Sequence, residues 1–406
     1  MAETAQNTCF QEEMTRTITI LCCLLIALST AAQKKELNQA RILIKSGKDK
    51  DLLSAEKLMT GLLNDSANRQ NPRIYLTWYE AVERQYQAAN EKLYLRQQYD
   101  TTEFFSLIRR LHLIAETLDT LDSKQKYRER HAEQMNLLRR NLFAGGTWHV
   151  KKEDFDEAYR FFQTYLDAAH QPLFSDYHYQ SSDTLMPQAG YWATYCAYKL
   201  QRPDSVLCYH EWALRDTSKA VYTLQYLCEA YRQMADTTDL VKTLQEGFNR
   251  FPTHPYFFPR LADYYTARKD YQTVLQLTTE ALKAEADNKM FLLARSVAQL
   301  NLEQYDDCLA TSEHLIALDD DMSEPYLHVA TVKLNQALEL EKKNQPRLYR
   351  KQLTQLYTDA RPYMEAYRKL APNDLQHWAP ALYRIYLNLN MGKQFEEIDR
   401  LLRNYK

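Results

Sequence analysis

Histidine is the side chain most often used for proton transfer and metal binding, and the chain contains ten of them. None forms an HExxH pair or a cysteine–histidine cluster with zinc spacing, and no G-x-S-x-G turn exposes a serine nucleophile. His112, His149, His210 and His314 lie singly in predicted helices. We therefore predict that the protein is not an enzyme, with no catalytic residue, metal site or cofactor.

One acidic cluster could suggest a cation site: Asp319, Asp320 and Asp321 are followed closely by Glu324. The cluster lacks the alternating ligands and the turn glycine of a calcium loop. Acidic groups are favoured at helix N-termini, so we interpret it as the cap of a helix that begins at Ser323.

The composition narrows the classes of function. The chain has 51 basic and 53 acidic residues, a net charge of -2, and so lacks the positive footprint of a nucleic-acid-binding protein. Only seven glycines occur in 406 residues, which is few for the loops that cradle phosphates. We expect no nucleic-acid partner.

The N-terminal segment has the features of an export signal. Arg16 supplies a positive charge, and residues 18–28 form an apolar run that small residues follow. We predict that residues 1–33 are a signal peptide, with Met14 as the true start. An uncleaved anchor is the alternative, although a membrane span needs about 20 residues. Once the leader is removed, we expect no integral membrane span.

The clearest pattern in the chain is a repeat of 34 residues. Tyr271 and Tyr305 are separated by this number, and so are Val274 and Cys308. A period of this length indicates a stack of small helical units, each of which buries its apolar face against the next.

The repeat resembles that of the tetratricopeptide-repeat (TPR) family, a helix-turn-helix of 34 residues. Units with this pattern begin at Arg139, Pro187, Val221, Pro255, Lys289 and Ser323. The family needs small residues where paired helices cross, and the matching positions hold Gly146, Cys228, Ala262, Ser296, Cys308 and Ala330. With its leader, the chain resembles exported TPR proteins of Gram-negative bacteria.

This resemblance implies an all-α fold, an α-solenoid of TPR-like repeats that forms a right-handed superhelix. We expect degenerate helical hairpins over 34–138 and a TPR array over 139–406. The array is interrupted by insertions near 173–186 and 335–356.

In the TPR family the first helices of successive units line a concave groove. The matching positions here are Tyr191, Tyr195, Tyr198, Lys199, Tyr222, Glu229, Arg232, Tyr256 and Asp263. Tyrosine offers a broad contact area together with a polar hydroxyl, which suits a binding surface. The alternative is that a chain with 30 tyrosines places some of them there by chance.

The same positions in later units are apolar, from Met290 to Leu334. An open apolar strip is a liability on a soluble protein. Either a partner or the second insertion must cover it, and we expect the insertion to fold over it.

We therefore expect a non-catalytic scaffold or adaptor that binds an unknown protein or peptide partner through the concave groove. The alternative is a binding protein for a glycan or small solute, because stacked tyrosines also suit sugar rings. The expected location is outside the cytoplasm, in the periplasm or associated with the cell envelope.

Overall fold

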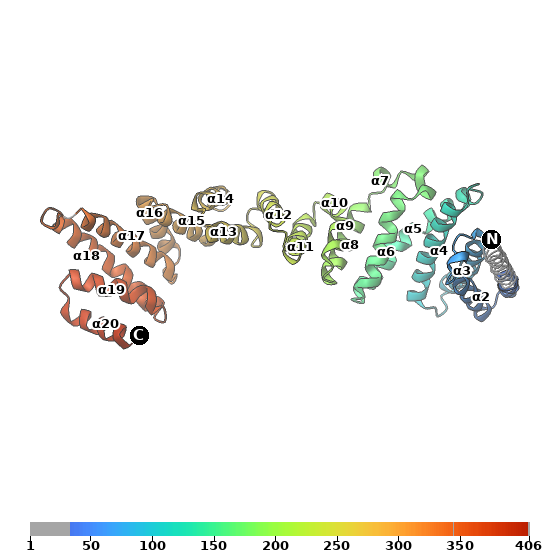
Figure 1. Cartoon of the computed structure of the whole chain (residues 1–406), viewed down its shortest axis with the longest axis horizontal. Coiled ribbons are helices and arrows are strands. Elements are labelled where there is room, and N and C mark those ends of the chain that lie inside the picture. The colour runs from blue at the N-terminus through green and yellow to red at the C-terminus, as the bar shows by residue number, and fades with distance from the viewer. Residues whose placement is uncertain (1–32, 344, 405–406) are drawn as a thin grey trace, which may run out of the picture. The chain divides into compact units, whose positions relative to one another are not determined.

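The computed structural model describes residues 33–343 and 345–404, and within these ranges the chain consists of helices and turns without a β-strand. Figure 1 shows the order of the helices. The prediction of an all-α solenoid is confirmed. The predicted leader, residues 1–33, lies outside the described residues except for Gln33, which begins a helix. None of the described helices combines the length and the apolar character that a membrane crossing requires.

The chain forms two compact units, which divide between Met234 and Ala235. In the first unit a helix over 33–46 precedes the long helices, and each long helix packs against the next. The elements that follow are α2 (Asp49–Leu62), η1 (Ser66–Asn68), α3 (Pro72–Tyr94), α4 (Thr101–Leu121), α5 (Arg128–Lys151), α6 (Phe155–Asp167), η2 (Ala168–His170), η3 (Pro172–Tyr177), α7 (Tyr179–Ser182), α8 (Met186–Lys199), α9 (Pro203–Cys208), α10 (His210–Arg215) and α11 (Ala220–Gln233).

The second unit continues the pattern of paired helices and short turns. Its elements are α12 (Thr237–Arg250), α13 (Phe257–Ala267), α14 (Tyr271–Ala284), α15 (Lys289–Asn301), α16 (Tyr305–Leu318), α17 (Ser323–Lys342), α18 (Pro346–Leu370), α19 (Leu375–Asn388) and α20 (Gly392–Asn404). Consecutive helices pack against each other throughout this unit.

The turn inside each helix pair has a fixed backbone geometry that follows the repeat. Gln201, Ala235, Lys269 and Glu303 all adopt a left-handed conformation, with φ between 54° and 58°. They are spaced 34 residues apart, at 201, 235, 269 and 303. Each lies two residues beyond the end of the first helix of a pair, where a left-handed residue lets the chain turn back.

Hydrogen bonds explain why the helices stop at these turns. At the end of α13, the amide of Lys269 donates to the carbonyl of Thr266, and the amide of Asp270 donates to the carbonyl of Tyr265. This pair of bonds is the Schellman motif, which satisfies carbonyls at the end of a helix. The Asp270 carboxylate then accepts from the Thr273 amide and caps the start of α14.

Neighbouring helices, both within a pair and from one pair to the next, approach closely at small residues. An added Cβ at Gly190 of α8 would lie 2.7 Å from the backbone nitrogen of Ala213 in α10, and one at Gly247 would lie 2.3 Å from the ring of Phe257. The predicted small positions are buried in the same way, with Ser296 and Cys308 fully inaccessible. Larger side chains at these positions would force the helices apart.

The first insertion is anchored by a buried arginine. Residues 173–186 form most of η3, α7 and the start of α8. The guanidinium of Arg139 in α5 lies between the rings of Tyr165 and Tyr179, 3.7 and 3.8 Å from their centroids. It pairs with the carboxylate of Asp183 and donates to the carbonyl of Tyr165 at 2.9 Å.

The charge of Asp183 is maintained by its neighbours. Burial acts to raise the pKa of this carboxyl, but hydrogen bonds from Tyr165 and from the amide of Leu185, together with the charge of Arg139, lower it below its usual value. The insertion is therefore fixed to α5 and α6 by an ion pair between two charged groups.

The second insertion covers only one end of the apolar strip. Its Leu353 and Leu356 pack against the core cluster that contains Leu334 and contacts Leu327. Residues 335–342 continue α17, and residues 346–356 form the first part of α18, which packs against α17. The strip is covered unevenly, since Met290 is 37% exposed whereas Leu334 is 9% exposed. The helix continues because the sequence between Ser323 and Lys342 contains no glycine, and its one proline lies in the first turn.

The interpretation of the acidic cluster as a helix cap was wrong. No side chain caps the start of α17. Asp319 instead accepts a hydrogen bond from the ammonium of Lys289 at 2.7 Å and another from the amide of Asp321. Both bonds hold the pKa of the Asp319 carboxyl below its usual value.

The left-handed turn residues generate a first prediction. We expect Lys269→Gly to raise the free energy of unfolding by roughly 0.5–1 kcal/mol, because glycine removes the steric cost of positive φ. Ala267→Gly, two residues earlier in the helical part of the same turn, should lower it by a similar amount. Urea unfolding of both variants measures the difference. Equal destabilisation by the two changes would contradict the role assigned to this turn.

The buried arginine generates a second prediction. Arg139→Ala should lower the free energy of unfolding by about 3–5 kcal/mol, because it leaves the Asp183 carboxylate without its partner. The neighbouring side chain of Arg140 is exposed, so Arg140→Ala serves as the matched control and should change stability little. Adding Asp183→Asn to Arg139→Ala should recover part of the loss. A loss for Arg139→Ala as small as that for Arg140→Ala would refute the anchor.

Candidate partner-binding surface

Three of the predicted groove residues lie on one face of α8. Tyr191, Tyr195 and Tyr198 are spaced by four and three residues, which places them on the same side of a helix. The rings of Tyr191 and Tyr195 stack with their centroids 6.4 Å apart. Tyr191 is only 8% exposed, whereas Tyr195 and Tyr198 are partly exposed. Tyr191 therefore belongs mainly to the core, and the other two can contact a partner.

Tyr226 of α11, which the sequence analysis missed, holds these rings together. Its ring stacks on Tyr198 with 4.5 Å between centroids, and it lies 5.9 Å from Tyr195 and 6.3 Å from Tyr191. It falls at a repeat position outside those that the TPR resemblance assigns to the groove. Its position becomes clear only when α11 packs against α8.

Two further aromatic residues extend the surface. Trp192 meets the edge of Tyr195 at 5.7 Å, and Phe155 at the start of α6 meets the same ring at 5.8 Å. Aromatic pairs in tilted and edge-on contacts stabilise one another beyond the area they bury. We call the set the aromatic cluster; its members are Phe155, Tyr191, Trp192, Tyr195, Tyr198 and Tyr226.

Two lysines border the aromatic cluster. The ammonium of Lys199, at the end of α8, lies 5.3 Å from the centroid of the Phe155 ring. The ammonium of Lys219 lies 5.9 Å from the ring of Tyr191 and 5.8 Å from that of Tyr222. Both lysines are exposed. The border of the cluster therefore carries two ammonium groups, beside the Asp216 carboxylate that also acts on the Tyr191 hydroxyl.

The other predicted groove residues lie on α11 or in the second unit. Tyr222 of α11 is 43% exposed, and Glu229 and Arg232 form an ion pair of 2.8 Å along the same helix. Tyr256 precedes α13, and the guanidinium of Arg260 lies 3.7 Å from its ring centroid. Asp263 is exposed on α13. Of the predicted groove residues, those on α8 and α11 lie in the first unit, whereas Tyr256 and Asp263 lie in the second.

Burial favours the protonated form of two hydroxyl groups in the cluster, those of Tyr191 and Tyr226. Burial, followed by a hydrogen bond with Tyr191, raises the pKa of Tyr226. Burial also raises the pKa of Tyr191. A neutral phenol can both donate and accept a hydrogen bond. The cluster therefore offers flat ring faces, the neutral hydroxyls of Tyr191 and Tyr226, and two neighbouring ammonium groups. All of these can contact a partner.

Comparison with known proteins gives likenesses of fold only. No protein-family model matches the chain, and no curated protein matches its sequence. Among solved structures, it is similar to the C-terminal part of a TPR repeat-containing protein from Cytophaga hutchinsonii, at 14% identity over 63% of this chain and 92% of that one, with a TM-score of 0.41.

Two other solved structures show the same kind of similarity. The TPR domain of P58(IPK) is 13% identical over 92% of this chain and 99% of that one, with a TM-score of 0.26. The TPR2AB domain of yeast Sti1, solved in complex with pHSP90, is 12% identical over 63% and 99%, with a TM-score of 0.24. At these TM-scores the similar structures carry no argument about this protein, so the description of its fold rests on its own repeat of helix pairs.

Proposed function

We propose that the protein is a non-catalytic scaffold that binds a protein or peptide partner through the aromatic cluster. The observation that carries this proposal is the packing of Tyr226 against Tyr195 and Tyr198, because it fixes aromatic side chains of two helices that remain partly exposed. Tyrosine and tryptophan are the side chains most enriched at the energetic centres of protein interfaces. Since the rings are already packed, binding requires little ordering of side chains.

The charged border indicates the chemistry of the partner. Lys199 and Lys219 are exposed beside the rings, so carboxylates of a partner would be attracted to the edge of the cluster. Aromatic or proline side chains would pack on the rings themselves. An extended or helical segment that combines apolar and acidic residues satisfies both requirements.

The test is a binding experiment with residues 33–406. Proteins retained from an envelope extract are identified, and their affinity is then measured with purified components. The double variant Tyr195→Ala and Tyr198→Ala should weaken binding at least tenfold, because interface aromatics contribute about 2 kcal/mol or more each. Tyr191 is left unchanged, since its burial makes any substitution a test of stability.

A matched control distinguishes binding through the aromatic cluster from nonspecific binding by any exposed aromatic side chain. Tyr94 is 85% exposed and belongs to α3, outside the aromatic cluster, so Tyr94→Ala should leave the affinity unchanged. Equal effects of the two variants would reject the cluster as the binding surface. Saturable binding of one glycan or solute class, lost in the double variant, would instead favour the small-ligand alternative.

We also propose that the protein acts in the cell envelope, on the basis of its N-terminal sequence. The apolar run over 18–28 after Arg16 supports export. Mass spectrometry of the protein from a periplasmic fraction should give the mass of a chain that begins near Gln33. Recovery of the uncleaved chain from the cytoplasmic fraction would refute this location.

A further inference from the structure

The hairpin of α17 and α18, which lie side by side in the second unit (Figure 1), is longer than its neighbours. α17 and α18 contain 20 and 25 residues, whereas α16 and α19 contain 14 each. The excess of α18 over α19, 25 against 14 residues, corresponds to about 16 Å of helix. The end of the hairpin therefore extends beyond the helices on either side.

Contacts with the neighbouring helices show where this projecting end begins. Tyr305, the first residue of α16, lies beside Glu339 of α17. Arg384, near the end of α19, pairs with Glu341 at 2.5 Å. The chain then continues past both contacts before α18 returns. We call residues 342–351 the hairpin tip.

The hairpin tip carries five basic side chains and no acidic one. All five are exposed: Lys342, Lys343, Arg347, Arg350 and Lys351. No acidic residue occurs between Glu341 and Asp359. Glu341, the nearest carboxylate in sequence, is already paired with Arg384, and none of the five cations forms an ion pair within the part of the chain that the structure describes. In a chain with a net charge of -2, this is a local concentration of positive charge.

The basic side chains of α18 lie on the side that faces away from the core. Arg347 is followed by Arg350 and Lys351 at spacings of three and four residues, which places all three on one side of the helix. Leu353 and Leu356, on the other side, pack against the core cluster of the second unit. The basic side of α18 is therefore directed toward solvent.

One apolar side chain lies among these cations. Leu348 is 68% exposed and is placed between Arg347 and Lys351 on the first turns of α18. Next to it, Tyr349 is half-buried, and the ammonium of Lys343 lies 5.5 Å from the centroid of its ring. This contact brings a cation of α17 beside those of α18. The hairpin tip thus combines an exposed leucine with surrounding positive charge.

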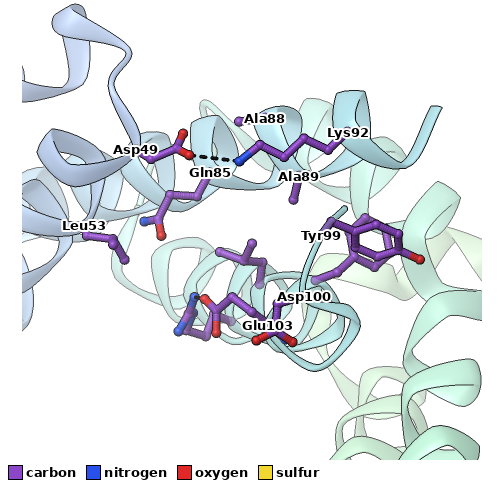
Figure 2. A pocket seen from close by; sticks show the side chains of 12 residues that line it. Asp49, Leu53, Gln85, Ala88, Ala89, Lys92, Tyr99, Asp100 and Glu103 are labelled. Atoms are coloured by element: carbon purple, nitrogen blue, oxygen red, sulfur yellow. Dashed lines mark hydrogen bonds and ion pairs between the residues drawn. The ribbon is translucent and has the colours of Figure 1, made fainter. Parts of the chain in front are cut away.

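The charges of the hairpin tip differ from those of the pocket between α2, α3 and α4, which Figure 2 shows. In the pocket the ammonium of Lys92 lies 2.9 Å from the carboxylate of Asp49, and Arg110 lies 2.5 Å from Glu103. These charges already neutralise one another. The cations of the hairpin tip have no such partners, and together they attract a surface that carries many negative charges.

We propose that the hairpin tip docks the protein on a membrane surface rich in anionic lipids. The basic side chains pair with lipid phosphates, while their apolar stems and Leu348 reach the boundary with the acyl chains. A protein partner is a poorer match, because a protein interface has a buried apolar centre that one exposed leucine is too small to provide. The contact uses other residues than the aromatic cluster and does not depend on the proposed scaffold function.

The test is a sedimentation assay of residues 33–406 with lipid vesicles. Vesicles of phosphatidylglycerol and phosphatidylcholine in equal parts should retain the protein, and vesicles of phosphatidylcholine alone should not. Added salt should weaken the retention, because salt screens exposed charges. Equal retention by the two kinds of vesicle, or retention by neither, would overturn the proposal.

A charge variant and a matched control locate the contact. The variant neutralises the basic side of α18 and consists of Arg347→Gln, Arg350→Gln and Lys351→Gln. The control neutralises three exposed lysines of the first unit and consists of Lys45→Gln, Lys48→Gln and Lys50→Gln. The variant should weaken binding to the anionic vesicles at least about tenfold, since each basic residue near such a surface contributes about fivefold. The control, in a segment that also contains Asp49 and Asp51, should change binding little, and an equal loss in both would refute the assignment.

The exposed leucine separates insertion into the lipid from attraction by charge alone. Leu348→Ser should weaken binding roughly threefold or more, because less apolar surface is buried in the membrane. Leu387→Ser, at a side chain of α19 that is 53% exposed, should leave binding unchanged. Equal effects of the two substitutions would contradict the insertion of Leu348.

Two further measurements distinguish this contact from protein binding. Soluble polyglutamate serves as the probe for an acidic protein. Retention of polyglutamate by the hairpin tip, without retention by the anionic vesicles, would overturn the membrane assignment in favour of an acidic protein. The Tyr195→Ala and Tyr198→Ala variant should bind the vesicles normally, so failure of the aromatic cluster as a binding surface leaves this test intact.

Discussion

The close approach of paired helices is the constraint on which the rest of the structure depends. At Gly190 the backbone of α8 comes so near to α10 that even a methyl group would meet the amide of Ala213. Comparable contacts occur at Gly145, Gly146 and Gly247, where an added Cβ would lie 2.3–2.7 Å from a facing ring. They determine how closely successive helices can lie, and therefore which side chains of α8 and α11 can meet to form the aromatic cluster.

The sequence predicted the helix pairs because their signal is local and periodic. Small residues at Cys228, Ser296 and Cys308 recur at positions of a 34-residue unit, and all three are fully buried. The surface tyrosines of α8 could be found for the same reason, since their spacing alone places Tyr195 and Tyr198 on one face. For these features a pattern within one unit contains the needed information.

Features that depend on contacts between different repeat units could not be predicted from a pattern within one repeat. Tyr226 reaches the aromatic cluster only through the packing of α11 on α8. Arg139 was identified as the start of a repeat unit, although its structural role depends on Asp183, which is 44 residues away. The continuation of α17 to Lys342 is different, because it follows from a local feature of the sequence, the absence of a helix breaker between Pro325 and Lys342.

The anchor at Arg139 also has a consequence for the order in which the chain can fold. Most helices contact the helix next in sequence, so their contacts close short loops and can form quickly. The ion pair of Arg139 with Asp183 needs α5 and α6 to be in place first, because the guanidinium lies on the ring of Tyr165 in α6. The first insertion would then dock late, onto a surface already formed, and unfolding of this unit would begin with its release.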